Sequence, residues 1–219
     1  MKLSKLYSIL MMGMMLVSFP SCNGAFEDIY DEPVEKGPEG EFGFKNIDLD
    51  NNTGTIYVDA SSYTRWIYLN FHDRTIDSLE IGSGNPEPQN WDVALHRYDA
   101  KILGEGAMET KFTELAVFVN SGKIPSGDFV ADVPGKVTVD MSGMMEGVIK
   151  TVDSPVNLEL AKWLDVDTST MPPIYTLSNK VYLVKLKDGT IAAVKLKDFR
   201  NKKFDKGFLT IDYIYPVQF

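Results

Sequence analysis

Methionine is the residue type with the most distinctive chemistry in this sequence. There are ten methionines, and five of them fall within residues 1–15. Four of the remaining five lie between residues 141 and 171, namely Met141, Met144, Met145 and Met171, whereas Met108 stands apart. A thioether can ligate a soft or borderline metal, such as copper(I), or the iron of a haem. It can equally fill a gap in an apolar core, because methionine is flexible and apolar.

The residues around these methionines indicate loops. Met144 and Met145 stand between two glycines in the segment VDMSGMMEGV, which is typical of a turn. Met171 precedes Pro172 and Pro173, and a residue before proline favours an extended conformation. Copper sites usually take three or more sulfur ligands that are close in sequence, and Met171 is far from the others. Two methionine-bearing loops are therefore expected, with core packing as the alternative.

Few other residues could perform catalysis. The two histidines are His72 and His96, and both are expected to be packed or surface residues. The sequence has no metalloprotease helix motif, no phosphate-binding Gly-Lys loop and no nucleophile elbow. Carboxylates are numerous enough that a glycosidase pair stays open, although no spacing singles one out. The pattern favours a protein that is not an enzyme.

Residues 1–21 have the layout of a secretory signal peptide. Lys2 and Lys5 precede a short apolar stretch, and Cys22, the only cysteine, follows directly. The stretch is too short for a membrane-spanning helix, which needs about 20 apolar residues. A lone exported thiol cannot form an internal disulfide. The segment resembles a bacterial lipoprotein signal with its lipobox, which implies that Cys22 is lipidated and becomes the first mature residue.

Residues 22–41 are expected to form an acidic linker behind the lipid anchor. They contain Pro and Gly and show no apolar periodicity, so they cannot bury enough surface to offset chain entropy. Acidic residues after the lipidated cysteine also resemble the surface-export signal of some Gram-negative lipoproteins. Loss of Lys2 and Lys5 with the signal peptide changes the formal net charge from −9 to −11. Such a protein has no general attraction to phosphate, so nucleic acid is not an expected partner.

Residues 42–219 are expected to form a single domain that is mostly β, with antiparallel packed sheets and one short helix. The sequence predicts strands wherever β-branched and aromatic residues alternate or cluster. The predicted strands are Thr55–Asp59, Trp66–Phe71, Trp91–His96, Leu115–Val119, Val137–Met141, Val181–Leu186, Thr190–Leu196 and Phe208–Tyr215. Asp188–Gly189 predicts a hairpin turn. The helix is expected at Asn157–Leu164, with Leu158, Ala161 and Leu164 on its buried face.

Three segments resemble the HmuY family of haem-binding lipoproteins. Asn90–Lys101, NWDVALHRYDAK, is similar to the WD-hydrophobic-HRYD signature of that family. Ser169–Leu183, STMPPIYTLSNKVYL, and the closing YIYP at Tyr213–Pro216 are similar too. The resemblance spans nearly the whole mature domain. It implies a largely β fold that clamps haem (iron protoporphyrin IX) between two axial ligands from neighbouring loops.

The resemblance also implies where those ligands lie. The best-known members of the family use two histidines, but no histidine follows His96 in this sequence. The chain therefore resembles a methionine-ligating branch, with Met145 and Met171 as axial ligands of the haem iron and Met144, or Met141, as the alternative to Met145. A thioether does not protonate and favours ferrous iron relative to imidazole. The haem walls are expected among Phe129, Trp163, Ile174 and Tyr175.

The same resemblance implies a lipid-anchored protein of the outer membrane, exposed at the cell surface, that passes haem to a TonB-dependent outer-membrane receptor. Two other functions stay open. A carbohydrate-binding surface lipoprotein would need exposed aromatic side chains, for which Trp66 and Trp91 are candidates, although both lie in strand-like runs. A periplasm-facing hydrolase would need a pair of carboxylates.

Overall fold

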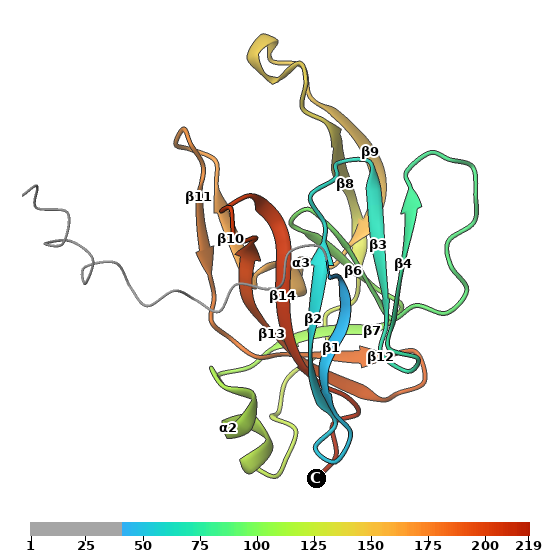
Figure 1. Ribbon diagram of the computed structural model, residues 1–219, viewed down its shortest axis with the longest axis vertical. Coiled ribbons are helices and arrows are strands. Elements are labelled where there is room, and N and C mark those ends of the chain that lie inside the picture. Colours follow the sequence, from blue (N-terminus) through green and yellow to red (C-terminus); the bar gives the residue numbers. More distant parts are fainter. Residues whose placement is uncertain (1–40) are drawn as a thin grey trace, which may run out of the picture. The chain divides into compact units, whose positions relative to one another are not determined.

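Two antiparallel sheets and two separate hairpins make up the part of the chain that the structure describes, residues 41–219 of the computed structural model (Figure 1). The predicted signal peptide, Cys22 and the linker as far as residue 40 lie outside the described residues. The predicted fold class is confirmed, since the chain is mostly β with short helices and antiparallel pairing.

The larger sheet has six strands and the smaller sheet has four. The six-stranded sheet has the order β1 (Gly43–Asp48), β2 (Thr53–Asp59), β14 (Lys206–Ile214), β13 (Ile191–Arg200), β12 (Tyr182–Leu186) and β7 (Gly104–Glu109). The four-stranded sheet has the order β4 (Thr75–Glu80), β3 (Arg65–Asn70), β5 (Val93–His96) and β6 (Asp99–Ile102). The turn at Asp188–Gly189 joins β12 to β13, as the sequence predicts.

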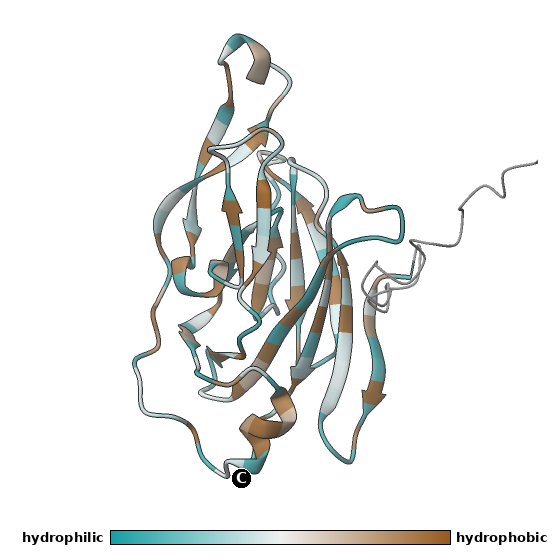
Figure 2. Cartoon of the chain, turned by 90° about the vertical axis from the view of Figure 1, so that its left-hand side faces the viewer, coloured by the Kyte–Doolittle hydropathy of each residue, from teal (hydrophilic) through white to brown (hydrophobic). Residues whose placement is uncertain are grey.

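The main core is built from the inward-facing residues of both sheets. In β2, Ile56 and Val58 are buried while their neighbours Thr55, Tyr57 and Asp59 are partly exposed, which is the period of two that a half-buried strand requires. Leu69 of β3 and Leu196 of β13 belong to the same buried cluster. Figure 2 shows the matching bands of apolar and polar residues along the strands.

The opposite face of each sheet is covered as well. Trp66, Tyr68 and Ala94 of the smaller sheet pack against Val137 of β8 (Val133–Asp140) and Val156 of β9 (Lys150–Val156). A second apolar cluster therefore holds the β8–β9 hairpin from its base to the middle of its strands. On the larger sheet, Leu183, Ala193 and Ile214 pack with Phe118 of the helix α2 (Leu115–Asn120) in a third cluster.

The helix α2 corrects one prediction, because Leu115–Val119 was expected to be a strand. Its fully buried side chain is Phe118, and Leu115 and Val119 are partly buried beside it, whereas Val117 is 55% exposed. This spacing of three and four residues is that of one helix face. A continuous apolar run of five residues does not distinguish this arrangement from a strand.

The predicted helix at Asn157–Leu164 is present but shorter, as α3 (Leu158–Ala161). Asn157 caps it, since its side chain accepts a hydrogen bond from the backbone amide of Leu160 over 2.8 Å. The predicted buried face was wrong in part: Leu158 is 59% exposed and Leu160 is buried. Leu164 lies beyond the helix, at the start of strand β10 (Leu164–Asp167).

Candidate functional site

Two hairpins extend beyond the sheets at the same end of the described structure and carry the candidate methionines at their tips. The first consists of β8 (Val133–Asp140) and β9 (Lys150–Val156), and the second of β10 (Leu164–Asp167) and β11 (Ile174–Leu177). Neither hairpin is hydrogen-bonded into a larger sheet. Figure 1 shows the β8–β9 hairpin extending farther than its neighbour, and the view in Figure 2 agrees.

The tip of the β8–β9 hairpin is a single 3-10 turn, η1 (Met144–Glu146), so Met144 and Met145 lie in a loop as predicted. The backbone amide of Met144 donates to the carbonyl of Met141 over 3.0 Å, and that of Val148 donates to the carbonyl of Gly143 over 2.8 Å. Gly147 ends the turn with a φ of 75°, a conformation that glycine adopts without strain.

An ion pair joins the two strands of the β8–β9 hairpin where the tip begins. Lys150 Nζ lies 2.8 Å from Asp140 Oδ2, and the other oxygen of Asp140 accepts the backbone amide of Ser142 over 2.8 Å. These contacts, the lysine first, hold the pKa of Asp140 well below its usual range and raise the pKa of Lys150. These contacts therefore hold together the two ends of the loop that carries Met144 and Met145.

The tip of the β10–β11 hairpin also begins with an aspartate that binds a serine two residues later, as Asp140 binds Ser142. Asp167 accepts hydrogen bonds from the side chain of Ser169 and, over 2.8 Å, from its backbone amide, and these lower the pKa of the Asp167 carboxyl. The hydroxyl of Thr170 donates to the carbonyl of Pro172 over 3.1 Å, across Met171. Met171 itself is 74% exposed.

Tyr175 of β11 anchors this second hairpin to the sheets. Its ring stacks on Phe199 at a centroid distance of 5.1 Å, and its hydroxyl oxygen lies 2.8 Å from that of Tyr98. The ammonium of Lys206 lies 3.9 Å from the centroid of the same ring. The hairpin is thus fixed four residues after Met171, on the side that faces the core.

The exposure of the methionine side chains separates the candidate ligands from the core. Met145 is 86% exposed, Met171 is 74% exposed and Met144 is 39% exposed, whereas Met108 is 5% exposed within the third apolar cluster. Core filling therefore describes Met108 and does not describe the two tip residues. The structure places Met145 and Met171 on two separate hairpins and not within one packed cluster.

Most of the expected haem walls are core residues. Trp163 is 3% exposed in the main core, and Phe129 packs in the third cluster. Of the four candidates, Ile174 is the one that is freely exposed, at 53%. Val148 and Ile149, which follow Met145 on its own tip, are 57% and 47% exposed and were not singled out from the sequence. Two adjacent apolar residues directly after a glycine-bounded loop are the signal that could have identified them.

His96 is packed and His72 lies at the surface, as the sequence analysis expected, and both have hydrogen-bond partners. His96 is fully buried, with one ring nitrogen 2.9 Å from the carbonyl of Tyr63 and the other 3.1 Å from Asp99. The side chain of His72 is 44% exposed and lies between Asp92 and Asp188, at 3.2 Å and 2.9 Å from its two ring nitrogens. Neither histidine lies on the two hairpins.

The aromatic candidates for carbohydrate binding are packed. Trp66 and Trp91 are 5% and 8% exposed. The ammonium of Lys101 lies 4.6 Å and 5.2 Å from their ring centroids and forms an ion pair with Glu87. Because these rings already hold a cation of the protein itself, they do not present a stacking surface to a sugar.

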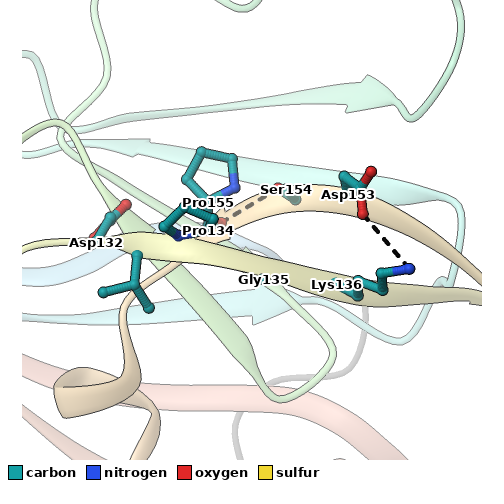
Figure 3. A pocket seen from close by; sticks show the side chains of 8 residues that line it. Asp132, Pro134, Gly135, Lys136, Asp153, Ser154 and Pro155 are labelled. Carbon is teal, nitrogen blue, oxygen red and sulfur yellow. Dashed lines mark hydrogen bonds and ion pairs between the residues drawn. The ribbon is translucent and has the colours of Figure 1, made fainter.

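A groove of about 830 Å³ lies at the base of the β8–β9 hairpin. Pro134 and Pro155 face each other there across the two strands, and Lys136 lies 3.8 Å from Asp153 (Figure 3). The groove is at the opposite end of the strands from Met144 and Met145, so it does not include the candidate ligands.

Within residues 41–219, no helix is both long and apolar enough to span a membrane. The same residues contain no group of three or more histidine, cysteine, aspartate or glutamate side chains arranged to hold a metal ion.

Several solved structures are similar to this chain. A provisionally assigned HmuY-like haem-binding protein from Bacteroides vulgatus is 49% identical, with a TM-score of 0.78, over 82% of this chain and 100% of that one. A provisionally assigned lipoprotein from Bacteroides fragilis is 46% identical, with a TM-score of 0.78, over 83% of this chain and 99% of that one. The apo form of an HmuY analogue from Tannerella forsythia is 27% identical, with a TM-score of 0.63, over 74% and 94%.

No curated protein sequence is similar enough to count as a relative. The family model described as HmuY protein matches residues 62–213, which include both hairpins and most of both sheets. Because this match covers more than half of the sequence, the chain belongs to the HmuY family.

Proposed function

We propose that this chain is a haem carrier that holds the iron between Met145 and Met171, and that it is not an enzyme. The observation that carries the proposal is the exposure of both thioethers, 86% and 74%, at the tips of two neighbouring hairpins. An apolar side chain that is exposed to this extent stabilises the folded protein little. A role as ligand accounts for two such side chains better than packing does.

The residues at the tips suit a porphyrin. A thioether is a soft, neutral ligand of haem iron, and the sulfurs of Met145 and Met171 would hold the iron. Val148, Ile149 and Ile174 expose apolar surface beside the methionines, and a flat apolar macrocycle would bury that surface. The bound haem supplies the iron and its redox chemistry, while the chain supplies the sulfur ligands and the apolar contacts.

Met145 is the ligand that we propose from the first hairpin, with Met144 as the alternative. Both lie in η1, but Met145 is 86% exposed and Met144 is 39% exposed. Neither hairpin is hydrogen-bonded into a larger sheet, so a change in the spacing of the two tips would leave the strand pairing of the sheets intact.

The relatives support haem as the ligand and a lipid anchor as the attachment. The Bacteroides vulgatus relative is described as haem-binding and the Bacteroides fragilis relative as a lipoprotein. We extend both properties to this chain. Cys22 then carries the lipid, the protein is held at the outer membrane facing the cell exterior, and haem passes to a TonB-dependent outer-membrane receptor.

An absorbance titration of the purified protein with haemin, before and after reduction with dithionite, tests the proposal. We expect a shifted Soret band in both states and a low-spin spectrum with tighter binding in the reduced state, because thioethers favour ferrous iron. A panel of glycans should produce no change in tryptophan fluorescence. If haemin causes no spectral shift in either oxidation state, the proposed function is wrong.

A further inference from the structure

The methionines that are most exposed are also the ones proposed to hold haem, and this coincidence has a chemical consequence. Exposed thioethers are oxidised to sulfoxides by hydroperoxides, whereas buried thioethers are protected. Met145 and Met171 are 86% and 74% exposed, and Met108 is 5% exposed. We propose that oxidation of Met145 and Met171 to methionine sulfoxide switches haem binding off reversibly. This inference rests on the proposed function.

The reaction is a two-electron transfer of oxygen. A lone pair on the methionine sulfur attacks the outer oxygen of a hydroperoxide, the O–O bond breaks, and the products are a sulfoxide and water or an alcohol. The sulfur is oxidised and the hydroperoxide is reduced. A sulfoxide is polar and coordinates as a harder ligand than a thioether, so it loses the preference for ferrous haem iron. In the reverse step two thiols supply the electrons, and the products are a disulfide, water and the restored thioether.

The structure makes the modification selective. Gly127 packs directly on the sulfur of Met108, because a Cβ atom at Gly127 would lie only 2.5 Å from that sulfur. A hydroperoxide therefore cannot reach Met108 without opening the third cluster. The exposure of Met144, at 39%, lies between that of the two proposed ligands and that of Met108. We expect oxidation first at Met145 and Met171, then at Met144, and last at Met108.

Among residues 41–219, few other side chains compete for the oxidant. All three tryptophans, Trp66, Trp91 and Trp163, are 8% exposed or less. The tip loops are short turns whose backbone hydrogen bonds do not involve the thioethers, so oxidation should leave the fold intact. The loss of haem binding would then follow from the change of ligand and not from unfolding.

The experiment treats the haem-free protein with hydrogen peroxide for increasing times and stops the reaction with catalase. Peptide masses locate the sulfoxides, and titration with haemin in dithionite measures binding. We expect affinity to fall by at least about tenfold as Met145 and Met171 oxidise, since loss of a ligand costs no less than loss of its supporting contacts. Treatment of the oxidised protein with methionine sulfoxide reductases and a thiol should restore the affinity for haem. Unchanged affinity in fully oxidised Met145 and Met171 would overturn the inference.

Two variants separate ligand chemistry from damage to the fold. In Met108→Leu the buried sulfur is gone, and haem binding should remain as sensitive to peroxide as in the wild type. In the double variant Met145→His and Met171→His, imidazole ligands replace the thioethers, and binding should survive the same treatment. Loss of binding in step with oxidation of Met108, or with loss of the near-ultraviolet circular dichroism signal, contradicts the inference. If the untreated wild type binds no haem, the proposed function itself fails.

Discussion

The side-chain amide of Asn157 donates a hydrogen bond to a carboxylate oxygen of Asp132 over 2.9 Å, which joins the two ends of the β8–β9 hairpin at its base. The same amide donates to the carbonyl of Val130 over 2.8 Å, and the backbone amide of Asn157 donates to the carbonyl of Ala100 over 2.6 Å. Because Asn157 also caps α3, which leads into β10, one buried residue fixes the bases of both methionine hairpins.

The first prediction concerns this residue. Asn157→Ala should lower the free energy of unfolding by about 1–3 kcal/mol, because the change leaves buried polar partners without a hydrogen bond. It should also weaken haem binding, since both tips lose their fixed base. Asp153→Ala, on the exposed part of the same hairpin, is the control and should change stability by less than about 0.5 kcal/mol. Denaturant titration measures the free energy of unfolding of both variants. Equal losses of stability in Asn157→Ala and Asp153→Ala would contradict the prediction.

The second prediction separates the ligand from the core methionine. Met171→Ala should weaken haem binding and alter the low-spin spectrum of the reduced complex, with little change in melting temperature, because this side chain is 74% exposed. Met108→Ala should lower the melting temperature and leave haem binding and the spectrum of the reduced complex unchanged. Its side chain is buried, and truncation of a buried methionine costs about 2–5 kcal/mol. A lowered melting temperature with an unchanged spectrum in Met171→Ala would show that Met171 is not a ligand.

The third prediction concerns haem binding in acid. Thioether sulfur does not protonate, so binding through Met145 and Met171 should persist down to about pH 5, below the ordinary histidine pKa. An absorbance titration of the haem complex from neutral to acid measures this. Haem release centred near about pH 6.5 would point to a histidine ligand and against the pair of methionines.

The fourth prediction concerns stability and His72. Partial burial opposes protonation of His72, but its hydrogen bond to Asp188 and the charge of Asp92 outweigh burial and raise its pKa. In turn the hydrogen bond from His72 lowers the pKa of Asp188 to about 2. A raised pKa in the folded state means that protonated His72 stabilises the fold fully below about pH 6.5, the ordinary value, and that this contribution is lost as the pH rises through the raised pKa.

Melting temperatures of the wild type and of His72→Asn, measured from about pH 6 to about pH 9, test this point. At the acidic end of this range the wild type should melt at a higher temperature than His72→Asn. The difference between the two melting temperatures should become smaller as the pH rises. A gap that is constant or widens with pH would show that the two carboxylates do not act on His72 as described.

The fifth prediction concerns the anchor. Cys22→Ser should yield a soluble or unprocessed protein, because the lipid on Cys22 is the proposed attachment and no helix within residues 41–219 is long and apolar enough to span a membrane. Partitioning into a detergent phase, followed by mass measurement of the N-terminus, distinguishes these forms. A variant that is processed and still enters the detergent phase would contradict lipidation at Cys22.

Much of the fold can be predicted from the sequence, because alternation in segments such as Thr55–Asp59 and the turn at Asp188–Gly189 follow directly from strand geometry. The strands that were missed carry little local signal. β4 exposes most of its residues, and β10 and β11 have only four residues each. Such strands form because partners elsewhere in the chain pair with them.

The candidate ligands could be predicted from the glycines around Met144 and Met145 and from the prolines after Met171. Their surroundings could not, because exposure depends on tertiary packing. Trp163 and Phe129 are near the methionines in sequence, but the chain turns them into two different cores. The exposed positions of Val148 and Ile149 follow from the length of the β8–β9 hairpin, which carries its tip beyond the sheets.

That length makes the β8–β9 hairpin a lever arm. β8 packs against the smaller sheet as far as Val137, and the three residues from there to Asp140, at about 3.3 Å each, give an arm of roughly 10 Å. A rotation of about 10° about Val137 would move Asp140 by roughly 2 Å. The packing of Val137 and Val156 against the smaller sheet therefore sets the position of a sulfur atom that neither residue touches. The spacing between the two candidate ligands is accordingly adjusted by residues that lie far from both.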